Sequence, residues 1–147
     1  MQASKEIRVT VIIIAVLVLA LVYLFQLFNF LLFFTNVLGL NVTFRPNTVF
    51  IFNKTTRLIL NDLACFGLIY AIFQEKKYLR VAFYIFLFEI SLLLPTYFII
   101  KLSLEGDSEI SSPLLSQIHR MIINPTLMIL LMIGFFYQRA IKNKKIS

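Results

Sequence analysis

Polar and ionisable side chains interrupt the long apolar runs of this sequence, and they are the residues that could do chemistry. A polar group inside a membrane-spanning helix is costly to insert and is by default a candidate functional residue. Depth within the predicted helices places eight of them toward one face of a membrane: Gln26, Asn29, Arg57, Asn61, Asp62, His119, Arg120 and Asn124. Residues three or four apart share a helix face, so Arg57, Asn61 and Cys65 are expected to form one row.

Two interpretations of this polar group stay open. In the first, Asp62 pairs with Arg57 or Arg120, and the amide side chains form a functional cluster near the outer surface. In the second, the same groups only hold the helices together, through interhelical hydrogen bonds of about 0.6 kcal/mol each. Both interpretations predict that these helix faces meet.

Glu89 is expected near the membrane midplane, about 13 Å along its helix, with no basic residue of another span at that depth. It is expected either to be protonated and hydrogen-bonded within the chain or to pair with a residue of a second protein. A proton relay would require further titratable groups at that depth, and the sequence predicts none. Glu89 therefore joins the candidate contact residues.

Cys65 lies in the segment Ala64-Cys65-Phe66-Gly67-Leu68, which resembles the ACxGL surroundings of the nucleophile in exosortases, membrane transpeptidases that process sorting signals. A nucleophilic thiol requires an activating base or arginine nearby. Arg80 is expected at the opposite membrane face and His119 at a shallower depth. A buried thiol more often behaves as a small apolar residue. We therefore predict no catalytic residue, and no metal site or cofactor.

Four apolar segments must position these residues. The chain has 147 residues, of which 60% are hydrophobic and 14% charged, whereas soluble domains have about 45–50% apolar and about 25% charged residues. Crossing a bilayer takes roughly 20 apolar residues, and the segments that approach this length are 9–34, 57–73, 81–100 and 119–138. The prediction is an all-α polytopic membrane protein with four transmembrane helices in a single domain, residues 1–147.

Basic residues predict the orientation of these helices, because cytoplasmic flanks carry an excess of Lys and Arg. Nine flank one side: Lys5, Arg8, Lys76, Lys77, Arg80, Arg139, Lys142, Lys144 and Lys145. Five lie on the other: Arg45, Lys54, Arg57, Lys101 and Arg120. Both termini are therefore predicted in the cytoplasm, and the formal net charge of +7 needs no nucleic acid to explain it.

Two long outer loops, 35–56 and 101–118, are the expected partner contacts. Residues 44–52 could form a short strand or lie in the membrane interface, and Asn41-Val42-Thr43 matches a glycosylation acceptor. A polar spacer, 105–112, precedes a predicted interfacial helix over 113–122. Pro95 and Pro125 are expected to bend the third and fourth helices.

Two stretches resemble the small exosortase-associated membrane proteins of Bacteroidetes, of the exosortase F or X type. Residues 119–145 are similar to that family's closing pattern of His-Arg, Asn-Pro, an apolar run and a terminal Phe-Tyr-Gln, here at Phe136, Tyr137 and Gln138. Residues 57–77 are similar to its Arg-x-x-x-Asn start and basic turn. The resemblance implies a non-enzymatic accessory of an exosortase in the bacterial inner membrane.

The expected function is therefore to bind another integral membrane protein within the lipid bilayer. The alternatives are a minimal cysteine transpeptidase using Cys65, with His119 and Arg120 as helpers, and a small-solute transporter. Transport is the less favoured alternative, because the sequence shows no inverted repeat and no pair of discontinuous helices.

Overall fold

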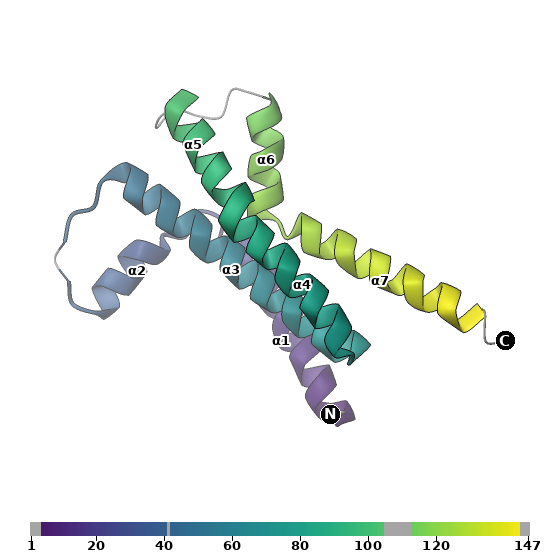
Figure 1. Cartoon of the computed structure of the whole chain (residues 1–147). Coiled ribbons are helices and arrows are strands. Elements are labelled where there is room, and N and C mark those ends of the chain that lie inside the picture. Colours follow the sequence, from purple (N-terminus) through teal and green to yellow (C-terminus); the bar gives the residue numbers. More distant parts are fainter. Residues whose placement is uncertain (1–3, 41, 105–112, 145–147) are drawn as a thin grey trace.

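The computed structural model describes residues 4–40, 42–104 and 113–144 (Figure 1). Its helical elements are α1 (Lys5–Leu24), α2 (Phe30–Val37), α3 (Pro46–Phe73), α4 (Lys76–Phe88), the π-helix η1 (Glu89–Leu93), α5 (Leu94–Leu104), α6 (Pro113–Ile123) and α7 (Thr126–Lys144). These described ranges contain no β-strand. The predicted all-α class is confirmed for this part of the chain.

Three helical stretches are long and apolar enough to cross a membrane, namely α1, α3 and the continuous stretch Lys76–Leu104. A fourth candidate exists if α6 and α7, which are bent by 65° relative to each other, cross as one span. Large apolar side chains of α1, such as Ile13 and Leu24, are more than half exposed and suit a lipid environment. The structure thus provides three or four candidate spans, where the sequence predicts four.

α3 is the central helix of the bundle, and most of the other helices contact it (Figure 1). On one side, Ala64 and Leu68 pack against Ala15 of α1. A Cβ atom on Gly67 would lie 3.5 Å from Val11 Cγ1, so α1 approaches this small residue closely. On another side, Cys65, Ile69 and Phe73 form a core cluster with Tyr78 and Ala82 of α4 and Met128 and Phe135 of α7.

The first apolar run, predicted as one helix over 9–34, is broken between Leu24 and Phe30. The side chain of Asn29 caps α2 by accepting a hydrogen bond from Leu32 N–H at 3.1 Å. The run contains neither Pro nor Gly at this point. The break is instead stabilised by polar contacts with α3, described below, which a hydropathy profile does not report.

α3 begins at Pro46, inside the segment predicted as the outer loop 35–56. The strand considered for 44–52 is wrong, because residues 46–52 are helical. Proline at the first helical position has a pre-set φ and no N–H to leave unsatisfied, so it favours a helix start here. Consequently Asp62 lies sixteen residues after the start of α3 and eleven before its end, near the middle of the helix. Asn41, the candidate glycosylation site, lies outside the described residues.

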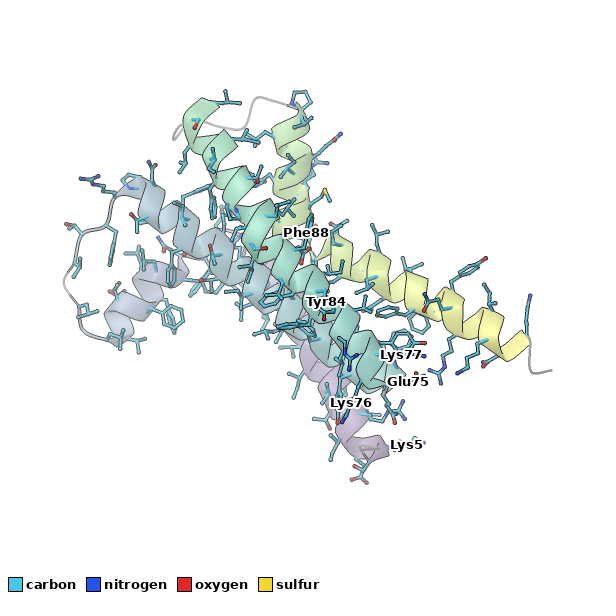
Figure 2. The ribbon with its side chains drawn as sticks, in the orientation of Figure 1. Lys5, Glu75, Lys76, Lys77, Tyr84 and Phe88 are labelled. Carbon is cyan, nitrogen blue, oxygen red and sulfur yellow. The ribbon has the colours of Figure 1, made fainter. Side chains whose placement is uncertain are left out.

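A tight turn joins α3 to α4, as the sequence predicts for the link between its second and third segments. Gln74 adopts the left-handed conformation with φ 56°, which ends α3. Lys77 Nζ lies 2.7 Å from Glu75 Oε2, and this hydrogen bond holds the pKa of Glu75 below its usual value. Figure 2 shows Lys5, Glu75, Lys76 and Lys77 at the same end of the bundle.

α4, η1 and α5 run on as one continuous helical stretch, in line in Figure 1. Leu94 N–H donates to Glu89 O across the wider π-helical turn, directly before Pro95. Because proline has no N–H to donate, such a turn is one way for a helix to accommodate it. The bend expected at Pro95 is therefore wrong: the helical stretch continues past the proline through a π-helical turn that begins at Glu89.

The predicted bend at Pro125 is confirmed, since α6 ends at Ile123 and α7 begins at Thr126. The helix predicted for 113–122 is also present as α6, in which Leu115 and Ile122 are buried and Leu114 is exposed. The polar spacer 105–112 lies outside the described residues. The direction change at Pro125 places α7 at an angle to the other helices (Figure 1).

Candidate functional site

Two carboxyl side chains meet in the middle of the bundle, Asp62 of α3 and Glu89 at the start of η1, and we call them the carboxyl pair. Each side chain is 1% exposed, and the two carboxyl groups lie close enough to form a hydrogen bond with each other. Asp62 Oδ2 and Glu89 Oε2 have no hydrogen-bond partner in the part of the chain that the structure describes. The pairing of Asp62 with Arg57 or Arg120 is therefore not what the structure has.

A hydrogen bond within the carboxyl pair requires at least one proton, because one of the two groups must supply the O–H donor. Two carboxylates in contact in an apolar interior would repel each other strongly. Within the described residues Glu89 lies against Asp62, and the two expectations for Glu89, protonation within the chain or pairing with a second protein, stay predictions. The sequence analysis expected no titratable group at the depth of Glu89. Asp62 lies there because α3 begins at Pro46, earlier than predicted.

Cys65 lies one turn after Asp62 and is fully buried in the core cluster with Ile69 and Phe73. Burial among apolar side chains disfavours the charged thiolate form that a nucleophile needs. His119 contacts Tyr97, which belongs to a different core cluster. The surroundings of Cys65 suit an unreactive, packed thiol.

Arg57 holds the break between α1 and α2. Its Nη2 donates to Phe25 O at 3.1 Å and to Phe28 O at 3.5 Å. The guanidinium also lies 6.0 Å from the centre of the Phe30 ring. Phe25 O also accepts from Phe28 N–H at 3.1 Å, so the arginine adds a second hydrogen bond to one carbonyl of the break and contacts the other. Arg57 is only 3% exposed, and its Nε has no hydrogen-bond partner.

Asn53, which the sequence analysis did not single out, holds the same break one turn earlier on α3. Its Nδ2 donates to Asn29 Oδ1 at 3.0 Å, and its Oδ1 accepts from Leu31 N–H at 3.1 Å. Asn53 precedes Arg57 by four residues, so extending the row Arg57, Asn61, Cys65 by one turn would have found it. Gln26, by contrast, is exposed in the break, not on a helix face shared with Asn29.

The buried row on α3 is confirmed, since Arg57 and Asn61 are each 3% exposed and Cys65 is fully buried. The remaining predicted residues lie on or beside α6. His119 Nδ1 is hydrogen-bonded to Tyr97 Oη, and Arg120 is exposed. Asn124 lies in the break before Pro125, where its carbonyl accepts from Thr126 N–H at 2.7 Å. Among the predicted polar residues, Arg57 and His119 thus share one end of the bundle, whereas Asp62 lies with Glu89 and Arg120 is exposed.

No group of three His, Cys, Asp or Glu side chains that could hold a metal ion occurs in residues 4–40, 42–104 and 113–144. The arrangement can do two things chemically: retain a proton in the carboxyl pair, and present positive charge near the break.

A comparison of the chain with protein-family models, curated proteins and solved structures gives no match to any of them.

Proposed function

We propose that the chain is a non-enzymatic accessory protein that binds another integral membrane protein, with an exosortase-type transpeptidase as the expected partner. In this proposal it lies in the bacterial inner membrane with both termini in the cytoplasm, because nine basic residues flank that side. The resemblance of residues 57–77 and 119–145 to exosortase-associated proteins supports the identity of the partner.

The groove between α4 and α7 is the proposed docking surface. It has a volume of about 580 Å³. Its apolar wall includes Val81, Ile85, Leu130 and Phe135, and Lys77 and Gln138 lie among its lining residues. Of the nineteen residues of α7, only Met128 and Phe135 are buried. One helix of a partner would bury part of the remaining apolar surface.

Gly134 is the observation that carries this proposal. It lines the groove, and a Cβ atom added to it would meet no atom within 4 Å. Lipid is as apolar as leucine, so helices associate in membranes through close packing at small residues rather than through hydrophobicity. An open glycine in an apolar groove lets a partner helix approach the backbone of α7 closely.

The test is co-purification of the full chain with its membrane partners after mild detergent extraction. Gly134→Ile is expected to lower recovery of a stoichiometric partner about tenfold, because overpacking a helix interface costs ~1–3 kcal/mol. The matched control is Ala140→Ile, a similar small-to-large change at an exposed position on another face of α7. Recovery of no partner by the wild type, or equal recovery by both variants, would refute the proposal.

The buried carboxyl pair favours a second candidate function, a proton-coupled small-solute transporter. The chain has helix breaks at 25–29 and 124–125 and a π-helical turn at Glu89, whereas the sequence suggested no discontinuous helices. Broken helices and buried carboxyl groups near the midplane occur in secondary transporters. Proteoliposomes that contain a pH-sensitive dye test this function: proton flux that Glu89→Gln abolishes supports it, and flux equal to that of empty liposomes rejects it.

A further inference from the structure

A group of basic side chains lies at the α2 end of α3, and we call it the basic cluster: Lys54, Arg57, Lys101 and His119. Lys54 and Arg57 lie close enough to repel each other, and Lys54, Arg57 and Lys101 all act electrostatically on His119. They come from α3, α5 and α6. Within the part of the chain that the structure describes, neither Lys54 nor Arg57 has a carboxylate partner.

Lys54 and Arg57 therefore lack an opposite charge among residues 4–40, 42–104 and 113–144. Arg57 is 3% exposed and its Nε has no partner, although arginine is almost never fully buried unless it is paired. Its contacts with Phe25 O and Phe28 O satisfy one terminal nitrogen but do not balance its charge. Lys54 lies 5.6 Å from the Phe50 ring and makes no ion pair there. An anion that reached this cluster would relieve the repulsion and gain charge-assisted hydrogen bonds.

An apolar pocket lies directly beside Arg57. It has a volume of about 410 Å³, and only apolar side chains line it. Phe25, Phe28 and Phe30 are among them, and these are the three residues that Arg57 contacts through two backbone carbonyls and one ring. Positive charge and an apolar pocket thus adjoin at the break between α1 and α2.

We propose that this end of the bundle binds an anionic membrane lipid, with the phosphate at the basic cluster and an acyl chain in the apolar pocket. Lys54 lies eight residues, or about 12 Å, from the start of a helix that exceeds a bilayer's ~30 Å hydrocarbon core, so it is within reach of the headgroup region. Lysine and arginine recognise phosphate oxygens through charge-assisted hydrogen bonds. A lipid supplies the phosphate and the apolar chain together, whereas a soluble anion supplies only the charge.

Native mass spectrometry of the full chain tests this site, in micelles that contain equal amounts of phosphatidylglycerol and phosphatidylcholine. The wild type is expected to retain phosphatidylglycerol preferentially. Lys54→Gln is expected to reduce that retention about fivefold, the effect of one basic residue near a headgroup. The control is Lys76→Gln, which removes an exposed charge at the opposite end of α3 and α4 and should change nothing (Figure 2).

A second variant tests the apolar half of the site without touching its charges. Leu21 lines the pocket and is 44% exposed, so Leu21→Trp should fill the pocket with little strain and lower retention of phosphatidylglycerol. The lipid proposal is overturned by equal retention of both lipids, or by Lys54→Gln behaving as Lys76→Gln does. Thermal stabilisation by inorganic phosphate without a lipid preference would also overturn it and would identify a soluble-anion site instead.

Discussion

The carboxyl pair makes the most direct prediction, because removing either partner should cost more than removing both. Glu89→Leu leaves the buried Asp62 carboxyl without its partner, and Asp62→Leu does the same to Glu89. A buried group deprived of its hydrogen bond costs roughly 1–3 kcal/mol, so each single variant should lose about 2 kcal/mol of unfolding free energy. The double variant buries two apolar side chains in their place and should lose about 1 kcal/mol or less.

The expected coupling energy is therefore about 3 kcal/mol, at the upper end for residues in contact. It exceeds the ~1.7 kcal/mol maximum measured for interhelical hydrogen bonds in another membrane protein, because here two buried acids would otherwise be unpartnered. Unfolding in mixed micelles with increasing SDS, followed by far-ultraviolet circular dichroism, measures the four free energies of the cycle.

The control cycle combines Glu89→Leu with Asn53→Ala. Asn53 lies nine residues, or about 13 Å, before Asp62 on α3, so these two changes should add within about 0.5 kcal/mol. If the Asp62–Glu89 double variant costs the sum of its singles within the same margin, the two side chains do not form a pair and the reasoning is wrong.

Three further predictions concern the packed thiol, the break and the α3–α4 turn. Cys65→Ala should cost about 1 kcal/mol of stability and leave partner recovery and any sorting reaction at wild-type level, and a processing defect in a folded variant would restore the transpeptidase hypothesis. Arg57→Met should speed hydrogen exchange in residues 25–30 before it affects α4, since the carbonyls it satisfies lie in the break, and uniformly faster exchange would contradict this local role. Because Lys77 lowers the pKa of Glu75, the contact persists at neutral pH and is lost as the pH falls through a value below 4.5. Lys77→Met should raise that midpoint in an NMR titration of Glu75, and an unchanged midpoint would assign the shift to other charges.

The local chemistry of the sequence was sufficient to predict several features of the structure. The bend at Pro125 was predicted because proline has no N–H to donate within a helix. The turn at Gln74 was predicted because a short link with basic residues joins two apolar segments. The four-residue period placed Arg57, Asn61 and Cys65 on one buried face. Each of these depends on neighbours in the chain or on helix periodicity, which the sequence contains directly.

The partners of the polar residues could not be predicted in this way. The depth assigned to Asp62 depended on where α3 begins, and the apolar stretch after Pro46 was equally consistent with a strand, an interfacial segment or a helix. An error in that start shifts every later residue along the membrane normal, so the meeting of Asp62 and Glu89 was missed. The break at 25–29 was missed because its stabilising groups, Asn53 and Arg57, belong to another helix.

The sequence by itself determined that this chain is helical, strongly apolar and built to lie in a membrane, because composition and periodicity are properties of each segment alone. Only the tertiary structure decided which polar groups are satisfied and by what. Arg57 meets the carbonyls of a broken helix, and the two acids meet each other. The physical reason is that a buried polar group must find a partner wherever the helix register brings one, and that register is set by packing between helices.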